Sequence, residues 1–362
     1  MFLKTVMERN QPLVRLGIEW QQNGVILPDT YLLDYDTILE NARSIKQAGD
    51  ANGVQNFFML KQIGRNPLIA HALTDMGYVG AVCVDFREAL TMVENQIPLG
   101  NVGHLVQIPR AALKKILRAK PVIVTVYTLE KAREISAVCT ELGLHQKLML
   151  RVLGEGDMLY SGQYGGFELQ ELDSAVRAIE AMPNVEVGGV CSFPCFLYDE
   201  AAQDILPMPN LRTVQTAAEM LRARGYRDLM LNTPSATCTH SIPMIAAAGG
   251  THGEPGHGLT GTTPYHAGHP DAEERPGYLY VSEVSHNLGD KAYCYGGGHY
   301  RRGHMKNALV GTTPENAKVV PVLPPDDSSI DYHFELQQNC PVSAAAVMAF
   351  RTQFFVTRSR VA

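Results

Sequence analysis

The stretch VQNFFMLKQIGRNP, residues 54–67, decides how the rest of the chain is interpreted. Residues 57–60 have the apolar character of a strand buried on both faces, and Gly64 and Pro67 indicate a loop that opens a helix. Lys61 therefore stands at the carboxyl end of the predicted strand. In a parallel α/β sheet or barrel this end carries the chemistry, and burial favours the neutral, nucleophilic form of an amine. A lysine that simply extends into solvent is the alternative.

The bulk composition is that of an ordinary globular protein. With 362 residues, 45% of them hydrophobic and 19% charged, the chain is long enough for one large domain and a smaller one. A net charge of -6 and a pI near 6.1 give no electrostatic reason to expect nucleic acid or an anionic membrane as a partner.

The cysteines and the apolar segments predict the compartment. Seven cysteines are an odd number, they are spread widely, and several lie in apolar segments, as free buried thiols do. The N-terminal residues have no apolar core of signal-peptide length, and no later stretch approaches the roughly 20 apolar residues of a membrane span. We therefore expect a reducing compartment and a cytoplasmic protein.

Short apolar segments alternate with segments of helical period along most of the chain. Strands are predicted over residues 31–34, 57–61, 79–84, 102–108, 122–126, 147–153, 185–193 and 228–232. Helices are predicted over residues 35–48, 67–76, 86–95, 110–119, 129–142, 169–181, 211–224 and 239–247. This spacing predicts an α/β fold made of a (β/α)8 TIM-type barrel.

The composition changes after residue 270, where β-branched and aromatic segments follow a polar run. We therefore predict a barrel domain over residues 28–270 and a second, mostly β C-terminal domain formed by residues 1–27 and 271–362. The last residues, FFVTRSRVA, have the pattern of a strand that is cut short. This pattern predicts that a natural C-terminal strand is missing.

Two loops at the predicted carboxyl end of the barrel are suited to an anion. Residues 249–264, GGTHGEPGHGLTGTTP, contain six glycines around Glu254, which indicates exposed amides that approach a ligand closely. Residues 232–239, NTPSATCT, follow a strand, and the hydroxyls of Thr233, Ser235 and Thr237 can combine with the free amides of the next helix. A flexible surface loop and a plain helix cap are the respective alternatives.

A third loop, MLYSGQYGGF at residues 158–167, is glycine-rich and follows another strand at the same predicted face. One amine, one carboxylate and an anion cradle at one face favour a phosphorylated carbonyl cofactor, held by its phosphate and bound covalently to Lys61.

At this point the chain resembles a known family, the fold-type III pyridoxal-phosphate enzymes of the alanine racemase and ornithine decarboxylase superfamily. It is most similar to the YhfX-type, amino-acid racemase-like branch. The similarity rests on five segments: LPDTYLLDYDTILENARSI (27–45), FFMLKQ (57–62), GQYGGF (162–167), NTPSAT (232–237) and GEPGHG (253–258).

The resemblance implies pyridoxal 5'-phosphate as the cofactor and an amino acid as the substrate. It implies that Lys61 forms the internal aldimine and that Glu254 holds the proton of the pyridine nitrogen. The remaining residues implied to bind the cofactor are Thr233, Ser235, Thr237, Gly256, His257 and Phe193. Phe193 stands near the position where the family places a histidine on the cofactor ring, and Gln163-Tyr164 replace the usual arginine or lysine of the glycine-rich loop.

The β domain of such enzymes closes the active site of a partner subunit, so the resemblance implies a homodimer with shared active sites. This domain is expected to supply the acid on the second face of the substrate. Cys340 and His333 are the candidates, with Tyr332 as a lesser one.

The function predicted from these features is an amino-acid racemase or epimerase. Alternatives within the resemblance are an amino-acid decarboxylase, a D-amino-acid aldolase or dehydratase, and a pyridoxal-phosphate-binding protein without turnover. A different class is a metal-dependent hydrolase, because four histidines lie within 18 residues: His252, His257, His266 and His269. Their spacing matches no common closed metal site, so no metal is predicted.

Overall fold

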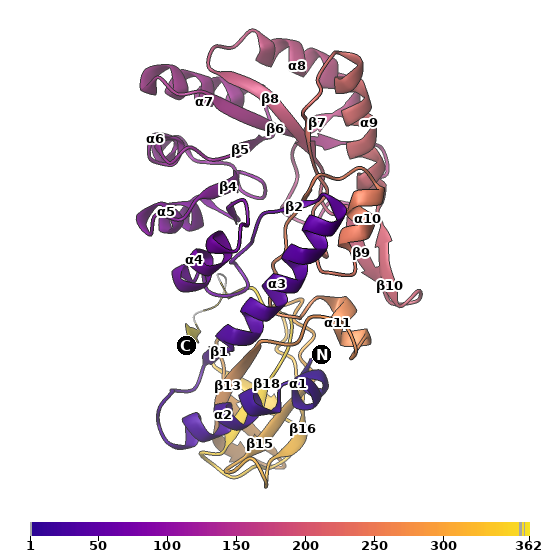
Figure 1. Ribbon diagram of the computed structural model, residues 1–362. Coiled ribbons are helices and arrows are strands. Elements are labelled where there is room, and N and C mark those ends of the chain that lie inside the picture. Colours follow the sequence, from indigo (N-terminus) through magenta and orange to yellow (C-terminus); the bar gives the residue numbers. More distant parts are fainter. Residues whose placement is uncertain (1, 355–356, 358) are drawn as a thin grey trace. The chain divides into compact units, whose positions relative to one another are not determined.

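The computed structural model describes residues 2–354, 357 and 359–362, and in it the chain forms two compact units. The barrel unit consists of residues 43–61 and 65–256. The β unit comprises the described part of residues 1–42, 62–64 and 257–362. Both are drawn in Figure 1. Helix α3 (Tyr35–Asn52) begins in the β unit and ends in the barrel unit.

The barrel unit is built on eight parallel strands within the described residues, as the alternating sequence pattern predicted. Their hydrogen-bonded order is β2-β12-β11-β8-β6-β5-β4-β3, and a parallel bridge between Phe58 and Ala81 joins the two ends of this order. The strands are β2 (Gln55–Asn56), β3 (Ala81–Cys83), β4 (Leu99–Val102), β5 (Ile123–Val126), β6 (Gln146–Leu153), β8 (Val185–Cys191), β11 (Met230–Asn232) and β12 (His252–Gly253). The TIM-type barrel is therefore confirmed.

Helices connect these strands and bury one apolar side each. In α6 the residues Ala112, Leu113, Ile116 and Leu117 are buried while the charged residues between them remain exposed or half-buried. The helices that follow α3 in this unit are α4 (Pro67–Asp75), α5 (Phe86–Glu94), α6 (Arg110–Arg118), α7 (Leu129–Leu142), α8 (Leu172–Glu180), α9 (Pro209–Ala223) and α10 (Ile242–Ala247). In the described part of the chain, no helix is both long and apolar enough to cross a membrane.

Shorter elements extend the loops at the carboxyl ends of two strands. Strand β7 (Phe167–Glu168) pairs with the end of β6 and leads into the short 3-10 helix η1 (Leu169–Glu171). After β8, strands β9 (Phe196–Asp199) and β10 (Asp204–Pro207) form an antiparallel hairpin. These loops lie at the end of the barrel where the sequence predicted the chemistry.

Three strands of the barrel differ from the sequence prediction. The strand predicted at 57–61 lies earlier, at Gln55–Asn56, with an isolated bridge at Phe58 beyond it, and Lys61 lies in the turn that follows. The strand predicted at 102–108 occupies Leu99–Val102, because Gly103 adopts a left-handed φ of 93° and the side-chain amide of Gln107 donates to the carbonyls of Gly103 and Thr125. The eighth strand, β12, lies inside the glycine-rich segment that was interpreted as a loop. A strand of two residues leaves too little periodicity for a sequence pattern to reveal it.

The β unit contains a six-stranded antiparallel barrel, closed in the order β13-β14-β17-β16-β15-β18-β13. The second, mostly β fold is therefore confirmed. Its strands are β13 (Tyr278–Leu288), β14 (Lys291–Tyr295), β15 (Asn307–Gly311), β16 (Lys318–Leu323), β17 (His333–Leu336) and β18 (Ala345–Met348). Strands β1 (Thr30–Leu33) and β19 (Arg360–Val361) extend the sheet beyond β13, and α11 (Pro264–Gly268) precedes β13.

Strand β1 was predicted as the first strand of the TIM-type barrel, and this prediction is wrong. It pairs antiparallel with β13, with Tyr31 opposite Tyr280. The reason is aromatic packing: the ring of Tyr31 stacks on Phe354 at 3.8 Å and is completely buried. The N-terminal arm also differs from a mostly β interpretation, because α1 (Leu3–Arg9) and α2 (Gln11–Gln22) are helices whose apolar side covers Leu279, Val281 and Val347 of the sheet.

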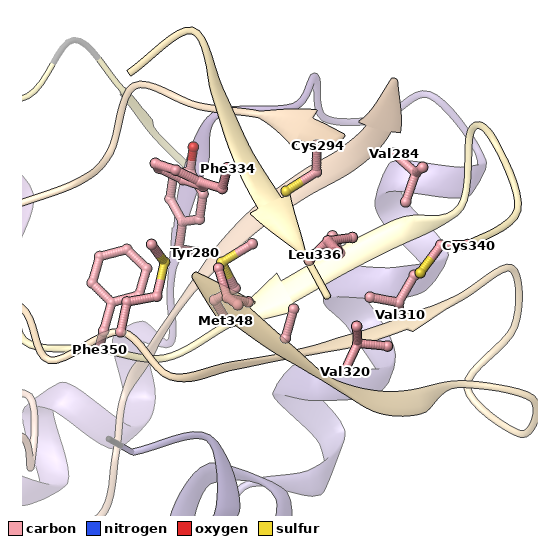
Figure 2. Close-up of a cluster of buried hydrophobic side chains, with 14 of the residues drawn as sticks. Tyr280, Val284, Cys294, Val310, Val320, Phe334, Leu336, Cys340, Met348 and Phe350 are labelled. Carbon is pink, nitrogen blue, oxygen red and sulfur yellow. The ribbon is translucent and has the colours of Figure 1, made fainter. Parts of the chain in front are cut away.

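The interior of the β unit is a continuous apolar core, which Figure 2 shows in close-up. Phe334, Leu336 and Met348 are fully buried in it. Cys340 belongs to this core, and burial raises the pKa of its thiol. The candidate thiol thus lies in the apolar core of its own β unit.

Candidate active site

Lys61 follows the segment that extends strand β2 along strand β12. The amides of Phe57 and Met59 donate to the carbonyls of Gly253 and Pro255, each at 3.0 Å. The chain segment ending in Lys61 therefore runs beside the segment that carries Glu254. Lys61 is half-buried, and its positive charge lowers the pKa of Glu254. The structure thus brings together the segments of the two residues to which the resemblance assigns the aldehyde and the ring nitrogen of the cofactor.

Side chains inside the barrel change from apolar to polar toward the carboxyl ends of the strands. One layer contains Phe57, Val82, Ile123 and Met149. Thr125 and Arg151 stand two positions beyond Ile123 and Met149, where side chains point to the same side again. Asn232 likewise follows Met230, which packs against this layer, and Glu254 follows His252, which stacks on Phe57. Thr125, Arg151, Asn232 and Glu254 are all buried. A buried polar layer has to be satisfied by partners, so this layer is the candidate active site.

Glu254 is held by side-chain amides from two other strands. The Nδ2 groups of Asn232 and Asn101 donate to its Oε1, at 2.5 and 3.5 Å, and Thr125 donates to the amide oxygen of Asn101 at 2.7 Å. Burial raises the pKa of Glu254 to about 7, against the lowering by the two amides and by Lys61. A carboxyl group in this state can exchange a proton at neutral pH.

His104 lies on the other side of the same carboxyl group. Its Nε2 is 3.8 Å from Oε2 of Glu254, and its Nδ1 is 3.8 Å from Sγ of Cys191. Burial and the nearby charges of Arg151 and Lys61 lower the pKa of His104 to about 3, so the imidazole is neutral. His104 was predicted within a strand, whereas it lies in the loop after β4.

Arg151 is a completely buried cation on β6. Its Nη1 donates to the hydroxyl of Tyr127 and its Nη2 to the carbonyl of Gln163, both at 2.9 Å. Its Nε has no hydrogen-bond partner, and no carboxylate pairs with it among the residues that the structure describes. A buried guanidinium without an acidic partner is unfavourable unless an anionic ligand faces it.

The sequence analysis missed Arg151, although a signal was present. One charged residue interrupts the apolar strand KLMLRVL at residues 147–153. The family's usual cation in the glycine-rich loop is absent here, and Arg151 reaches that loop from the strand instead. Gly166 lets the backbone of this loop approach β6 closely, because a Cβ there would stand 2.8 Å from the main-chain oxygen of Arg151 and its φ is 145°. Asn101, Asn232 and Tyr127 were also missed, because polar residues at strand ends are common.

The predicted anion cradle is a loop and does not lie at the first turn of a helix. Helix α10 begins only at Ile242, so the expected free helix amides are not next to residues 233–237. Instead, Ser235 and Ala236 adopt positive φ angles of 110° and 51°. The hydroxyl of Thr237 accepts a hydrogen bond from the amide of Glu254 at 3.2 Å, and the buried hydroxyl of Thr233 has no partner within the described chain.

Positive φ at two successive residues turns the backbone sharply at this point. Such backbone strain in residues other than glycine persists at functional sites. The loop therefore remains the candidate anion-binding segment, although its geometry differs from the predicted one. Gly256 is buried and follows Glu254 by two residues.

Phe193 lies at the end of β8 beside two other rings. Its ring centroid is 5.7 Å from that of His104 and 5.6 Å from that of Tyr160. The ring is half-buried, which leaves part of its surface for a ligand. Phe193 thus remains the candidate for the aromatic group on the cofactor ring.

The remaining candidates belong to the β unit. His257 follows the barrel unit directly; its Nδ1 is 3.3 Å from the hydroxyl of Thr262, and its Nε2 accepts from Nε of Arg351 at 3.4 Å. His333 is exposed at the start of β17, where its ring contacts His286 at 5.2 Å. Tyr332 is exposed beside it.

The four histidines of the metal hypothesis have separate environments. His266 pairs with Glu274 at 3.0 Å in the β unit, and His269 stacks on Tyr265. His252 stacks on Phe57 inside the barrel unit. Within the described residues, no group of three potential ligands gathers as a metal site. A metal-dependent hydrolase therefore has no support from this geometry.

A second buried carboxyl group lies near Lys61. Glu88 on α5 accepts a hydrogen bond from the amide of Val84 at 2.6 Å, while its Oε1 has no partner among the described atoms. Burial raises its pKa to about 7, and the charges of Arg65 and Lys61 act in the opposite direction.

Glu88→Gln is expected to change the pH dependence of stability. Because the pKa is raised in the folded state, ionisation between about pH 4.5 and 7 costs folding free energy, and glutamine avoids this cost. The variant should match the wild type near pH 4 and exceed it at pH 8, by up to about 3 kcal/mol from the raised pKa. Urea denaturation at both pH values measures the difference. The exposed Glu94→Gln on the same helix should show no such trend; an equal trend in both variants would contradict this account of Glu88.

Comparisons with known proteins agree with this geometry. Residues 33–264 match the family described as alanine racemase, N-terminal domain, and residues 279–362 match the family described as YhfX-like, C-terminal domain. The chain is 43% identical over 363 residues to the uncharacterized protein YhfX of Escherichia coli (strain K12), covering 100% of this chain and 93% of that protein.

The solved structures that superpose on this chain are named for different enzyme activities. D-threonine aldolase from Filomicrobium marinum superposes with a TM-score of 0.64 at 16% identity, covering 89% of this chain and 86% of that chain. Alanine racemase from Clostridium difficile superposes with a TM-score of 0.62 at 15% sequence identity, covering 89% of this chain and 85% of that chain. D-threo-3-hydroxyaspartate dehydratase from Delftia sp. HT23 superposes with a TM-score of 0.65 at 15% sequence identity, covering 89% of this chain and 90% of that chain. At these identities the likeness establishes the shared fold alone.

Proposed function

Because the chain belongs to the alanine racemase N-terminal domain family, we propose that it is a pyridoxal-phosphate-dependent amino-acid racemase or epimerase. The observation that carries the proposal is the pairing of the Lys61 segment with the Glu254 segment at the carboxyl end of the barrel. An amine that can bind an aldehyde and a carboxyl group that can hold a ring proton are the two groups this cofactor chemistry requires.

The residues at the site fit the cofactor. Thr233, Ser235, Thr237 and Gly256 are proposed to bind the phosphate, and the partnerless hydroxyl of Thr233 and the strained loop around Ser235 support this. Glu254 is proposed to hold the ring nitrogen, and Phe193 to cover a face of the ring. The buried guanidinium of Arg151 offers a positive charge for an anionic oxygen of the ligand.

When bound, pyridoxal phosphate supplies an electron sink that stabilises negative charge at the Cα atom of an amino acid. Lys61 is proposed to hold the cofactor's aldehyde carbon and, once the substrate amine replaces it, to move the proton at Cα on one face. Glu254 keeps the ring nitrogen protonated while charge develops. Glu254 is buried in the barrel interior, and the exclusion of water there strengthens its electrostatic effect.

Racemisation requires an acid on the second face of Cα. We propose that the β unit of a partner subunit supplies it in a homodimer, as in the sequence interpretation. His333 is the stronger candidate, because its imidazole is exposed. Cys340 is the weaker one, because its thiol lies in an apolar core and burial raises its pKa. We also propose a cytoplasmic location.

Decarboxylation is the second candidate, since a buried carboxyl group at the ring nitrogen stabilises any carbanion at Cα. A single experiment separates the two. The purified protein with pyridoxal phosphate is incubated with individual D- and L-amino acids, and chiral composition, carbon dioxide and aldehydes are followed. Inversion without gas, abolished by His333→Ala or Cys340→Ala, supports racemisation. Gas or an aldehyde without inversion would refute it and favour the decarboxylase or aldolase alternative.

A further inference from the structure

The carboxyl group of Glu254 is held asymmetrically. Both side-chain amides, from Asn232 and Asn101, donate to Oε1. Oε2 receives neither of them, and the polar side-chain atom opposite it is Nε2 of His104 at 3.8 Å. This nitrogen is buried and has no hydrogen-bond partner in the described part of the chain. A buried imidazole nitrogen without a partner is costly, so its position beside a carboxylate oxygen requires an explanation.

The backbone of His104 is fixed at this position. The hydroxyl of Tyr127 donates to the carbonyl of His104 at 2.5 Å, and Arg151 in turn donates to the same hydroxyl. The edge of the Phe193 ring stands against the imidazole. His104 is completely buried, so it cannot turn to water for a partner. The imidazole is therefore held against Glu254 by Tyr127 and Phe193, and Tyr127 is fixed in turn by Arg151 of the polar layer.

The neighbours of the imidazole also determine which nitrogen carries its hydrogen. Burial raises the pKa of Cys191 to about 12, so its thiol keeps its proton and can donate it to Nδ1. The imidazole is neutral, because burial and, to a smaller extent, the charges of Arg151 and Lys61 lower the pKa of His104. The single imidazole hydrogen then resides on Nε2, which faces Glu254.

We propose that His104 is a positioning residue whose Nε2–H faces Oε2 of Glu254 and, by its positive end, keeps this carboxylate ionised beside the ring nitrogen of the cofactor. The amides of Asn101 on β4 and Asn232 on β11 on Oε1, and the N–H of His104 after β4 facing Oε2, then surround one carboxylate. One proton can reside either on Glu254 or on the ring nitrogen of the cofactor. Stabilising the ionised carboxylate moves this proton from Glu254 to the ring nitrogen. This inference rests on the proposed binding of pyridoxal phosphate.

The test reads the proton on the ring nitrogen directly. The probe is pyridoxine 5'-phosphate labelled with ¹⁵N, which has no aldehyde and cannot react with Lys61. Its ¹⁵N chemical shift at pH 7.5 distinguishes a protonated from an unprotonated ring. In the wild type we expect the protonated shift. In His104→Leu the loss of a donor favours protonated Glu254, and the resonance should move toward the unprotonated value.

Matched variants distinguish a positioning role of His104 from a role in packing alone. His104→Gln retains an N–H donor and is expected to restore the protonated shift. His252→Leu removes another buried, neutral imidazole of the barrel, one that stacks on Phe57, and should behave like the wild type. If His104→Leu does not fold, His104→Phe serves for the same comparison.

The outcomes distinguish this inference from the function on which it rests. A protonated shift in the leucine or phenylalanine variant equal to that of the wild type would overturn the role of His104 and leave the proposed function intact. An equal loss of ring protonation in His104→Gln would overturn it as well. A wild-type protein that does not bind the probe would overturn both.

Discussion

Replacing Lys61 with alanine is expected to abolish turnover while the phosphate-anchored cofactor still binds. The amine is proposed both to bind the aldehyde and to move the proton at Cα, so its loss removes two functions at once. We expect the rate of Cα proton exchange to fall at least about 10³-fold, the upper part of the range for a general base. The measurement is ¹H NMR of amino acids incubated with the loaded protein in deuterated water.

Lys131→Ala is the matched control, because it removes a partly buried lysine of the same unit that pairs with Glu134 on α7. Its exchange rate should equal that of the wild type. A Lys61→Ala protein that exchanges Cα protons at the wild-type rate would remove the basis of the proposed function.

The second large effect is expected from Glu254→Gln. Glutamine has the same shape and can keep one hydrogen bond with Asn232, but it cannot hold a positive charge on the ring nitrogen. The carboxylate acts mainly when charge flows toward the ring, so Cα exchange should fall roughly 10²-fold to 10³-fold, as for other preorganised electrostatic groups. Cofactor affinity, measured by fluorescence titration, should change much less.

The control for this substitution is Glu186→Gln, on an exposed position of β8. It removes the same charge from the same barrel without touching the polar layer. If Glu254→Gln exchanged Cα protons as fast as this control, Glu254 would be a residue of the loop alone, and the similarity at GEPGHG would be misleading.

Much of the fold could be predicted from the sequence, because the spacing of apolar residues indicates which side of a helix or strand is buried. Strands such as Ile123–Val126 and helices such as Leu129–Leu142 follow one pattern each, and these were predicted closely. The pattern does not reveal which sheet a strand joins. Strand β1 has the expected apolar residues, but its partner is β13, almost 250 residues away in the chain, through packing of Tyr31 that no local signal records.

The site was predictable where a residue type is unusual for its position. Lys61 at a strand end and Glu254 among glycines are such residues, and the structure places their segments side by side. Residues whose roles depend on how neighbouring strands align were not predictable from the sequence. Asn101, Asn232 and His104 converge on Glu254 only because the strands stagger around the barrel, and each alone has an ordinary structural interpretation.

The central claim is that Lys61 holds a pyridoxal cofactor, and reduction with borohydride tests it most directly. The protein is loaded with pyridoxal phosphate, reduced, digested and analysed by mass spectrometry. We predict a phosphopyridoxyl adduct on the peptide that contains Lys61, and its loss in Lys61→Ala. Recovery of unmodified Lys61 from yellow, cofactor-loaded and reduced protein would contradict the account.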